Sequence, residues 1–275
     1  MATSLVITTY RRPDALSLVL SSVAAQTTLP CEVVVADDGS GPETLAVVDH
    51  HRALLAERGV SLIHAWHPDD GFRASAIRNC AIRRSCGDYL IFVDGDCVLH
   101  GDFVRSHEQY ARDGCFVQGG RVLLDKRHTA EALRAGVVAP GVWRAGVRNR
   151  LSGLSLPWLA PLVPSPRDPL RGVRSANLAV WRDDVERVNG FDERYVGWGR
   201  EDSDFVARLV MAGRRRRKLK FGGIVHHLWH PERPRGDLDR NHASFEQTLY
   251  TGAWRCEYGM AEHRCSARSE ATATT

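Results

Sequence analysis

Three clusters of carboxylate and imidazole side chains stand out in the sequence. They are Asp94 and Asp96 in the segment YLIFVDGDC (89–97), Glu201 and Asp202 in GWGREDSD (197–204), and the histidines of HHLWH (226–230). Two carboxylates one residue apart at a strand end point the same way and can hold a hard divalent cation, with phosphates completing its shell. The alternative is a turn in which the aspartates bond their own backbone.

The histidine cluster places three imidazoles within five residues. If Val225 ends a strand, one of them can reach a metal held by Asp96. A single histidine would more often be structural. A zinc site built from these histidines with Cys80 and Cys86 is conceivable, but its spacing matches no structural-zinc pattern.

The GWGREDSD segment places acids at the start of an expected helix with Phe205 and Leu209 on its apolar face. Acids favour the first turn of a helix because of its dipole and free N–H groups. Capping explains one or two acids, but it does not call for the preceding Gly-Trp-Gly. We therefore interpret this triplet as a wall against which a flat ring can stack.

Alternating strands and helices are expected to position these side chains. The predicted strands are Leu5–Thr9, Glu32–Ala36, Ser61–Ala65 and Tyr89–Val93, and the helices between them are Pro13–Ala25, Pro42–Glu57 and Arg73–Arg84. This order predicts βαβ units and a mostly parallel α/β sheet. Polar clusters follow three of the strands, at the edge where open α/β sheets bind ligands. Neither GxGxxG nor GxxxxGK[ST] occurs, so the sequence supports no dinucleotide fold and no P-loop.

The second half of the chain is predicted to hold a strand near Ser175–Val180, a helix over Asp183–Val188 and a strand near Lys218–Val225. The basic run RRRRK (214–218) is interpreted as a solvated turn after the 201–212 helix. The middle of the chain, 126–171, changes character, with arginines, tryptophans and prolines interleaved, and separates a first ordered block (1–125) from a second (172–261). The tail 262–275 lacks apolar content and is expected to be disordered.

Composition excludes several classes of protein. The chain has 275 residues with 43% apolar and 25% charged side chains, typical of an ordinary globular protein, and its net charge of +4 is too small to indicate a nucleic-acid partner. Seven scattered cysteines without a CxxC pair suggest reduced cytosolic thiols. We expect no signal peptide and no membrane-spanning segment, because the apolar stretches are short and broken by proline.

Together these segments resemble family 2 glycosyltransferases of the GT-A fold, from about residue 4 to residue 230. VITTYRRPD (6–14), VVVADDGS (33–40), GFRASAIRNCAI (71–82), YLIFVDGDC, RSANLAVWRDD (174–184) and the block from Gly190 to Leu209 carry the resemblance. The last block is similar to β-1,4-galactosyltransferases and chondroitin-type polymerases. The resemblance implies a Rossmann-like, mostly parallel sheet with a smaller acceptor-binding portion. It makes 1–125 the nucleotide-sugar-binding half, 126–171 a mobile connector or acceptor loop and 172–261 the acceptor and catalytic half.

The resemblance also implies roles for single residues. Those expected on the nucleotide-sugar side are Thr9, Tyr10, Arg12, Asp37 or Asp38 at the uracil, Arg78, and Asp94 at the ribose or the metal. Mn²⁺ or Mg²⁺ would be bound by Asp96 and by His227, with His230 and His226 as alternates. Asp202 would be the general base, with Glu201 and Trp198 on the acceptor sugar. Ser203 stands where the galactosyltransferases carry an acid, which leaves the acceptor open.

The expected reaction is the inverting transfer of a hexose or N-acetylhexosamine from a UDP-sugar to a saccharide or lipid-linked saccharide hydroxyl. A divalent cation stabilises the departing diphosphate, and one carboxylate takes the acceptor proton. The family suggests cell-surface polysaccharide or lipopolysaccharide assembly in the cytoplasm, with segment 134–163 touching the inner membrane face or serving as a buried connector. The alternatives are a nucleotidyltransferase, although TTYRRPD lacks its glycine-rich loop, and a catalytically silent carbohydrate- or membrane-binding module.

Overall fold

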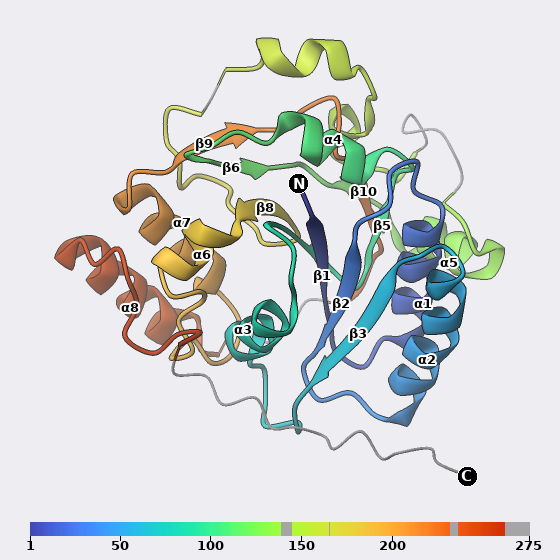
Figure 1. Cartoon of the computed structure of the whole chain (residues 1–275), viewed down its shortest axis with the longest axis horizontal. Helices are drawn as coiled ribbons and strands as arrows, with labels where there is room; N and C mark the ends of the chain where they lie inside the picture. The colour runs from blue at the N-terminus through green and yellow to red at the C-terminus, as the bar shows by residue number, and fades with distance from the viewer. Residues whose placement is uncertain (139–144, 165, 232–235, 262–275) are drawn as a thin grey trace.

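The computed structural model describes residues 1–138, 145–164, 166–231 and 236–261. Its main sheet has seven strands in the order β3-β2-β1-β4-β8-β6-β9 (Figure 1). Their bounds are β1 Thr3–Thr9, β2 Glu32–Asp37, β3 Ser61–Trp66, β4 Tyr89–Asp94, β6 Cys115–Gln118, β8 Asn177–Trp181 and β9 Arg215–Lys218. Only β8 among these seven runs against its neighbours, because β4 and β6 both pair with it antiparallel while the other pairs are parallel. The predicted α/β fold with a mostly parallel sheet is confirmed.

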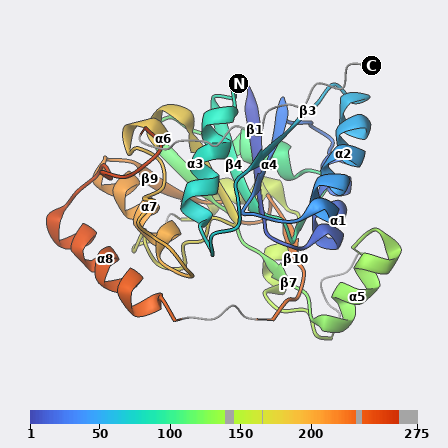
Figure 2. The same cartoon turned by 90° about the horizontal axis from the view of Figure 1, so that it is seen from below.

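Helices cover both faces of this sheet (Figures 1 and 2). Helices α1 (Pro13–Ala24) and α2 (Pro42–Ala56) lie on one face, and α3 (Ala74–Arg84), α6 (Arg182–Arg187) and α7 (Glu201–Met211) lie on the other. Successive strand residues point to opposite faces, so Leu5 and Ile7 join the core under α1 while Val6 joins the core under α3. The β-branched strands are thus buried on both sides, as parallel sheets require.

A second, three-stranded sheet supports the histidine cluster. Strand β10 (Val225–His227) lies between β5 (Cys97–Leu99) and β7 (Val122–Leu123). Val225 therefore begins a strand and does not end one, so the predicted strand over Lys218–Val225 is wrong. The register places His227 opposite Cys97, the residue that follows Asp96.

The basic run also differs from the prediction. Arg215–Lys218 forms β9 and pairs in parallel with β6, so it is no solvated turn. Arginines are tolerated in this strand because their charged ends find local partners. The Arg216 guanidinium donates to the carbonyls of Pro169 and Arg171, and Arg217 stacks over the Tyr110 ring at 3.7 Å.

The remaining elements lie around this frame. Helix α4 is Phe103–Tyr110, α5 is Lys126–Ala135 and α8 is Leu238–Thr251. Helix α8 packs against α7. Helices α5 and α8 lie at opposite ends of the molecule (Figure 2). Segment 126–171 contains α5 and two 3₁₀ helices, η1 (Arg150–Gly153) and η2 (Pro157–Leu162), while 139–144 and the predicted tail 262–275 lie outside the described residues.

Two further expectations concern the thiols and the membrane. Cys80 on α3 carries a disulfide, so the expectation of seven reduced thiols is wrong for this residue. Five other cysteines, Cys31, Cys86, Cys97, Cys115 and Cys256, are free. Within the described ranges, none of the helices is both long enough and apolar enough to cross a bilayer.

Candidate active site

The predicted site residues gather at one edge of the main sheet. Strands β1, β2 and β4 run parallel and end at Thr9, Asp37 and Asp94. Thr9 pairs with Asp37 and Thr8 pairs with Asp94, so the three ends are level. Strand β8 begins at this edge because it runs the other way, and it brings residues 174–176 beside them.

The carboxylate of Asp96 lies among positively charged and imidazole side chains. Arg12 donates to Asp96 Oδ2 at 3.1 Å, His227 Nε2 lies 3.6 Å from Oδ1, and His230 Nε2 lies 3.5 Å from Oδ2. Ligand atoms of Asp96, His227 and His230 all lie within 4.8 Å of one another, and Asp94 and Asp96 form a second such group with Cys97. Carboxylate oxygens combined with imidazole nitrogens suit a divalent cation such as Mn²⁺.

The three histidines do not share this arrangement. His226 and His227 are neighbours on β10, so their side chains leave opposite faces of the strand. His226 belongs to no candidate metal group among the described residues, and burial lowers its pKa to about 4. Burial also lowers the pKa of His227. The structure thus brings His227 and His230 to Asp96 and turns His226 away.

Gly95 explains the form of the Asp-Gly-Asp motif. Its N–H donates to the Thr8 carbonyl at 2.7 Å, and an added Cβ would come within 2.9 Å of Thr9 Oγ1. The chain therefore passes too close to β1 for any side chain at this position. Thr9 Oγ1 itself is buried and has no hydrogen-bond partner among the described residues.

The two aspartates of the Asp-Asp-Gly-Ser turn are buried and bonded within the protein. Asp37 accepts from the Ser40 N–H at 2.9 Å and lies 3.0 Å from His64 Nε2. Asp38 contacts His67 Nε2 at 2.7 Å and accepts from the Arg73 N–H at 3.0 Å. Both therefore shape the loop at the end of β2, and Asp37 lies deeper than Asp38.

Tyr10 lies near this loop, where its hydroxyl donates to Asp69 at 3.1 Å. Arg12 precedes α1 and turns instead toward Asp96. Of the residues predicted on the nucleotide side, Tyr10 thus lies near the turn after β2, and Arg12 lies beside the candidate metal ligand Asp96.

Arg78 on α3 joins the two carboxylate clusters. It is only 4% exposed, and its guanidinium contacts Thr8 Oγ1 at 3.2 Å, Asp94 at 3.8 Å and Glu201 at 3.4 Å. A buried guanidinium carries five donors in a fixed fork and stays charged. Arg78 therefore fixes the end of β4 relative to the start of α7.

Glu201 and Asp202 begin α7, and both carboxyl groups hold protons more tightly than usual. Burial and the charge of Asp202 raise the pKa of Glu201 to about 7, against the opposing charge of Arg78. Burial also raises the pKa of Asp202, although Arg78, Arg174 and the N–H groups of Ser203 and Ser175 act in the other direction. The dipole at the N-terminus of α7 would by itself lower the pKa of Asp202, but desolvation outweighs it here.

Asp204, two residues further along α7, has a different environment. Its carboxylate is fully buried, pairs with Arg208 at 2.8 Å, and accepts from the hydroxyls of Tyr195 and Thr248. These contacts hold α7 against α8 and leave Asp204 engaged within the fold.

The Gly-Trp-Gly triplet has a backbone role that stacking alone does not explain. Gly197 and Gly199 have φ of +78° and +108°, and Arg200, which caps α7, has φ of +75°. An added Cβ on Gly199 would meet the Leu238 side chain at 2.9 Å. The glycines thus permit the left-handed turn that aims the first residues of α7 at the site. Trp198 lies half-buried between them.

Several residues in the site were not singled out from the sequence. Arg174 and Arg121 place positive charge on Asp202 and on the Asp96–His227 group, and His67 contacts Asp38. Arg174 lies in RSANLAVWRDD, a segment that carries the family resemblance, so the sequence could have indicated it. Arg121 and His67 follow strands as isolated residues, and only the fold shows their positions.

Comparison with known proteins shows the family of the chain. Residues 4–151, more than half of the chain, match the family described as "Glycosyl transferase family 2", and residues 163–231 match "N-terminal domain of galactosyltransferase". The chain belongs to glycosyltransferase family 2. It is an enzyme of that class, as predicted.

The sequence similarity to curated relatives extends across most of the chain. A hyaluronan synthase from Pasteurella multocida is 26% identical over 226 residues, covering 76% of this chain and 23% of the relative. A validoxylamine A glucosyltransferase from Streptomyces hygroscopicus subsp. limoneus is 28% identical over 236 residues, covering 76% of this chain and 48% of the relative. The chain therefore spans about a quarter to a half of the length of these relatives.

Solved structures share the fold. TarS 1-349 from S. aureus in complex with UDP-GlcNAc has a TM-score of 0.61 at 16% identity, covering 96% of this chain and 69% of the other. The mannosyltransferase PcManGT from Pyrobaculum calidifontis, in complex with GDP-Man and Mn²⁺, has a TM-score of 0.57 at 17% identity, covering 91% and 63%. The likeness of the chain to both structures supports the predicted GT-A architecture.

Proposed function

We propose that the protein is an inverting glycosyltransferase that moves a hexose or N-acetylhexosamine from a UDP-sugar to a saccharide hydroxyl. The observation that carries this proposal is the joining of two carboxylate pairs through Arg78. One pair, Asp94 and Asp96, lies at the end of β4 among cations and imidazoles, and the other, Glu201 and Asp202, binds protons up to neutral pH. A glycosyltransferase needs a group that stabilises the leaving diphosphate on one side of the anomeric carbon and a base for the acceptor hydroxyl on the other side.

The first pair suits the departing diphosphate. Asp96, His227 and His230 would hold Mn²⁺ or Mg²⁺, and Asp94 would face the ribose or the metal. When bound, the cation would stabilise the negative charge of the leaving group as a Lewis acid. Arg12 and Arg78 add fixed positive charge at the same edge. Thr9, Tyr10, Asp37 and Asp38 would line the nucleotide pocket.

The second pair suits the acceptor. Asp202 would take the proton of the acceptor hydroxyl while that oxygen forms its bond to the anomeric carbon, and the electron pair of the breaking C–O bond leaves on the diphosphate. Attack opposite the leaving group inverts the carbon. Glu201 and Trp198 would position the acceptor sugar. Burial supports the role of Asp202, because a raised pKa makes its carboxylate a stronger base.

The proposal also includes a cellular setting for the reaction. The names of the relatives favour polysaccharide assembly, and lipopolysaccharide assembly is a variant of the same proposal. We place the reaction in the cytoplasm, at the inner membrane face. Trp158 and Leu162 on η2 are 71% and 74% exposed, which supports peripheral membrane contact by the described part of 134–163.

A screen for UDP release over several UDP-sugars, with and without Mn²⁺, tests the proposal. We expect one donor to release UDP faster when a saccharide acceptor is added, and EDTA to abolish the release. Full activity in metal-stripped protein would contradict the metal requirement. Release of pyrophosphate from a nucleoside triphosphate would favour a nucleotidyltransferase, and saccharide binding without any transfer would favour a silent binding module.

A further inference from the structure

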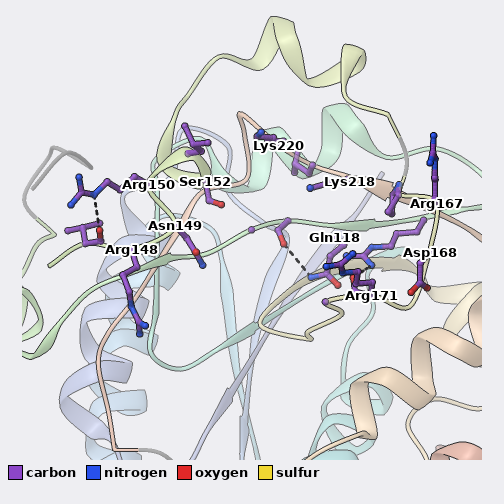
Figure 3. A pocket seen from close by; sticks show the side chains of 18 residues that line it. Gln118, Arg148, Asn149, Arg150, Ser152, Arg167, Asp168, Arg171, Lys218 and Lys220 are labelled. Atoms are coloured by element: carbon purple, nitrogen blue, oxygen red, sulfur yellow. Dashed lines mark hydrogen bonds between the residues drawn. The ribbon is translucent and has the colours of Figure 1, made fainter. Parts of the chain in front are cut away.

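A hollow opens at the same edge of the main sheet, beyond the ends of β6 and β9. These strands are parallel to β4 and end at Gln118 and Lys218, so their carboxyl ends face the same way as Asp94. The loops 147–152 and 166–172 close the hollow into a cavity of about 1150 Å³ (Figure 3). This is the size of site that takes a small-molecule or saccharide ligand.

The wall of this cavity is strongly basic. Six exposed or half-buried cations line it, against the single acid Asp168: Arg148, Arg150, Arg167, Arg171, Lys218 and Lys220. They come from three separate stretches of chain and surround the hollow from several sides (Figure 3). The overall net charge is only +4, so this concentration is local.

Among the described residues, these cations also lack the carboxylate partners that Arg208 and Arg214 have. Arg208 pairs with Asp204 and Arg214 pairs with Asp184, but none of the six forms an ion pair with a carboxylate in the described part of the chain. Unpaired like charges on a concave wall repel one another and raise the local concentration of anions. The cavity is therefore suited to an anionic ligand.

A hydrogen-bonded path of residues connects this cavity to the proposed base. Gln118, on the cavity wall, donates to the Arg174 carbonyl at 2.8 Å and accepts from the Arg174 N–H at 3.3 Å. The next residue, Ser175, donates its N–H to the Asp202 carboxylate. Segment 174–175 thus separates the cavity from the acceptor side of the site.

We propose that the cavity binds carboxylate or phosphate groups of the acceptor glycan, so that this enzyme takes an anionic acceptor. This inference rests on the proposed function and names the class of acceptor. An acceptor sugar at Asp202 extends past residues 174–175 into the basic hollow, where Arg148 and Lys218 meet its acidic groups. A recessed cavity admits such a chain, whereas a flat bilayer surface does not enter it.

Calorimetry of the full chain in EDTA and at low salt tests the inference. The probes are a hexasaccharide with a glucuronate at every second sugar, the same hexasaccharide after reduction of its carboxyl groups, and inorganic pyrophosphate. We expect the acidic hexasaccharide or pyrophosphate to bind at least about tenfold more tightly than the neutral hexasaccharide. The double variant Arg148→Ala/Lys218→Ala should weaken that binding by about tenfold. Tighter binding of pyrophosphate that is lost in the double variant would identify phosphate as the anionic group bound in the cavity. Tighter binding of the hexasaccharide that is lost in the same variant would identify carboxylate.

Arg52→Ala provides the matched control, because Arg52 is an exposed arginine on α2 that pairs only with Asp49 among the carboxylates of the described residues. Its affinity for the acidic probe should stay within about twofold of wild type. Equal affinity for acidic and neutral probes would overturn the inference, as would an unchanged affinity in the double variant. Binding confined to anionic vesicles or to RNA would overturn it too. UDP release by wild-type protein tests the proposed function separately.

Discussion

The two carboxylate pairs at the sheet edge have opposite surroundings. Asp96 is within 4 Å of one guanidinium and two imidazoles, whereas Glu201 and Asp202 are desolvated beside Arg78 and Arg174. The first environment favours a bound cation and a negatively charged leaving group. The second favours holding and then accepting a proton. This difference in charge and burial, more than residue type, distinguishes the roles that we propose for the four acids.

The largest expected effect comes from Asp202→Asn. Asparagine keeps the shape of the side chain but cannot take the acceptor proton, so kcat should fall by about 10²–10⁴ while donor KM changes little. Steady-state kinetics with a saturating donor measure this. Near wild-type turnover in folded protein would transfer the role of base to Glu201.

Asp204→Asn gives the contrast for that experiment. Removing its charge leaves the buried Arg208 guanidinium uncompensated, so the expected loss is in stability, about 3–5 kcal/mol in the free energy of unfolding. Denaturant unfolding curves measure it.

The next largest effect is expected at the histidines near Asp94 and Asp96. His227→Ala should weaken Mn²⁺ affinity by at least about tenfold, whereas His226→Ala should change it little, because their side chains leave opposite faces of β10. Activity titrated against Mn²⁺ concentration gives both values. A larger loss in His226→Ala would place the metal on the other side of the small sheet.

Glu201→Gln should produce a moderate effect with a pH signature. Two coupled acids bind a proton up to about pH 7, so the acidic limb of kcat/KM should lie near that pH in the wild type. Glutamine removes the neighbouring negative charge, which lowers the pKa of Asp202 and moves the limb to lower pH. The acceptor KM should rise as well. An acidic limb that stays at the same pH would contradict an effect of the Glu201 charge on the pKa of Asp202.

The same variant should change stability with the opposite pH dependence from a typical ion-paired acid. The pKa of Glu201 is raised on folding, so its contribution to stability is full below pH 4.5 and is lost as pH rises through about 7. Glu201→Gln should therefore melt at a higher temperature than wild type at pH 8 and at a similar temperature at pH 4. Thermal unfolding at the two pH values measures the difference.

The smallest effect is expected at the exposed apolar residues of η2. Trp158→Ser/Leu162→Ser should reduce flotation with anionic liposomes, because these side chains would enter the interface. Trp254→Ser is the control, since Trp254 is also exposed but lies under Arg187. No flotation of the wild type at low salt would remove the membrane contact from the proposal.

The sequence by itself determined the strands and helices of the first half and the positions of the acids. Alternating β-branched runs and amphipathic stretches have local periods that predict β1 to β4 within one or two residues, and parallel strands must bring their carboxyl ends together. Asp94, Asp96 and Thr9 could thus be assigned to one edge without coordinates.

Only the tertiary structure decided the rest. The run RRRRK looks like a solvated turn until β6 offers it a partner, and His226 and His227 are indistinguishable until β10 fixes their register. The raised pKa of Asp202 likewise depends on burial by segments that are distant in sequence. Strand pairing, register and desolvation arise from contacts between distant residues, so no local pattern in the chain specifies them.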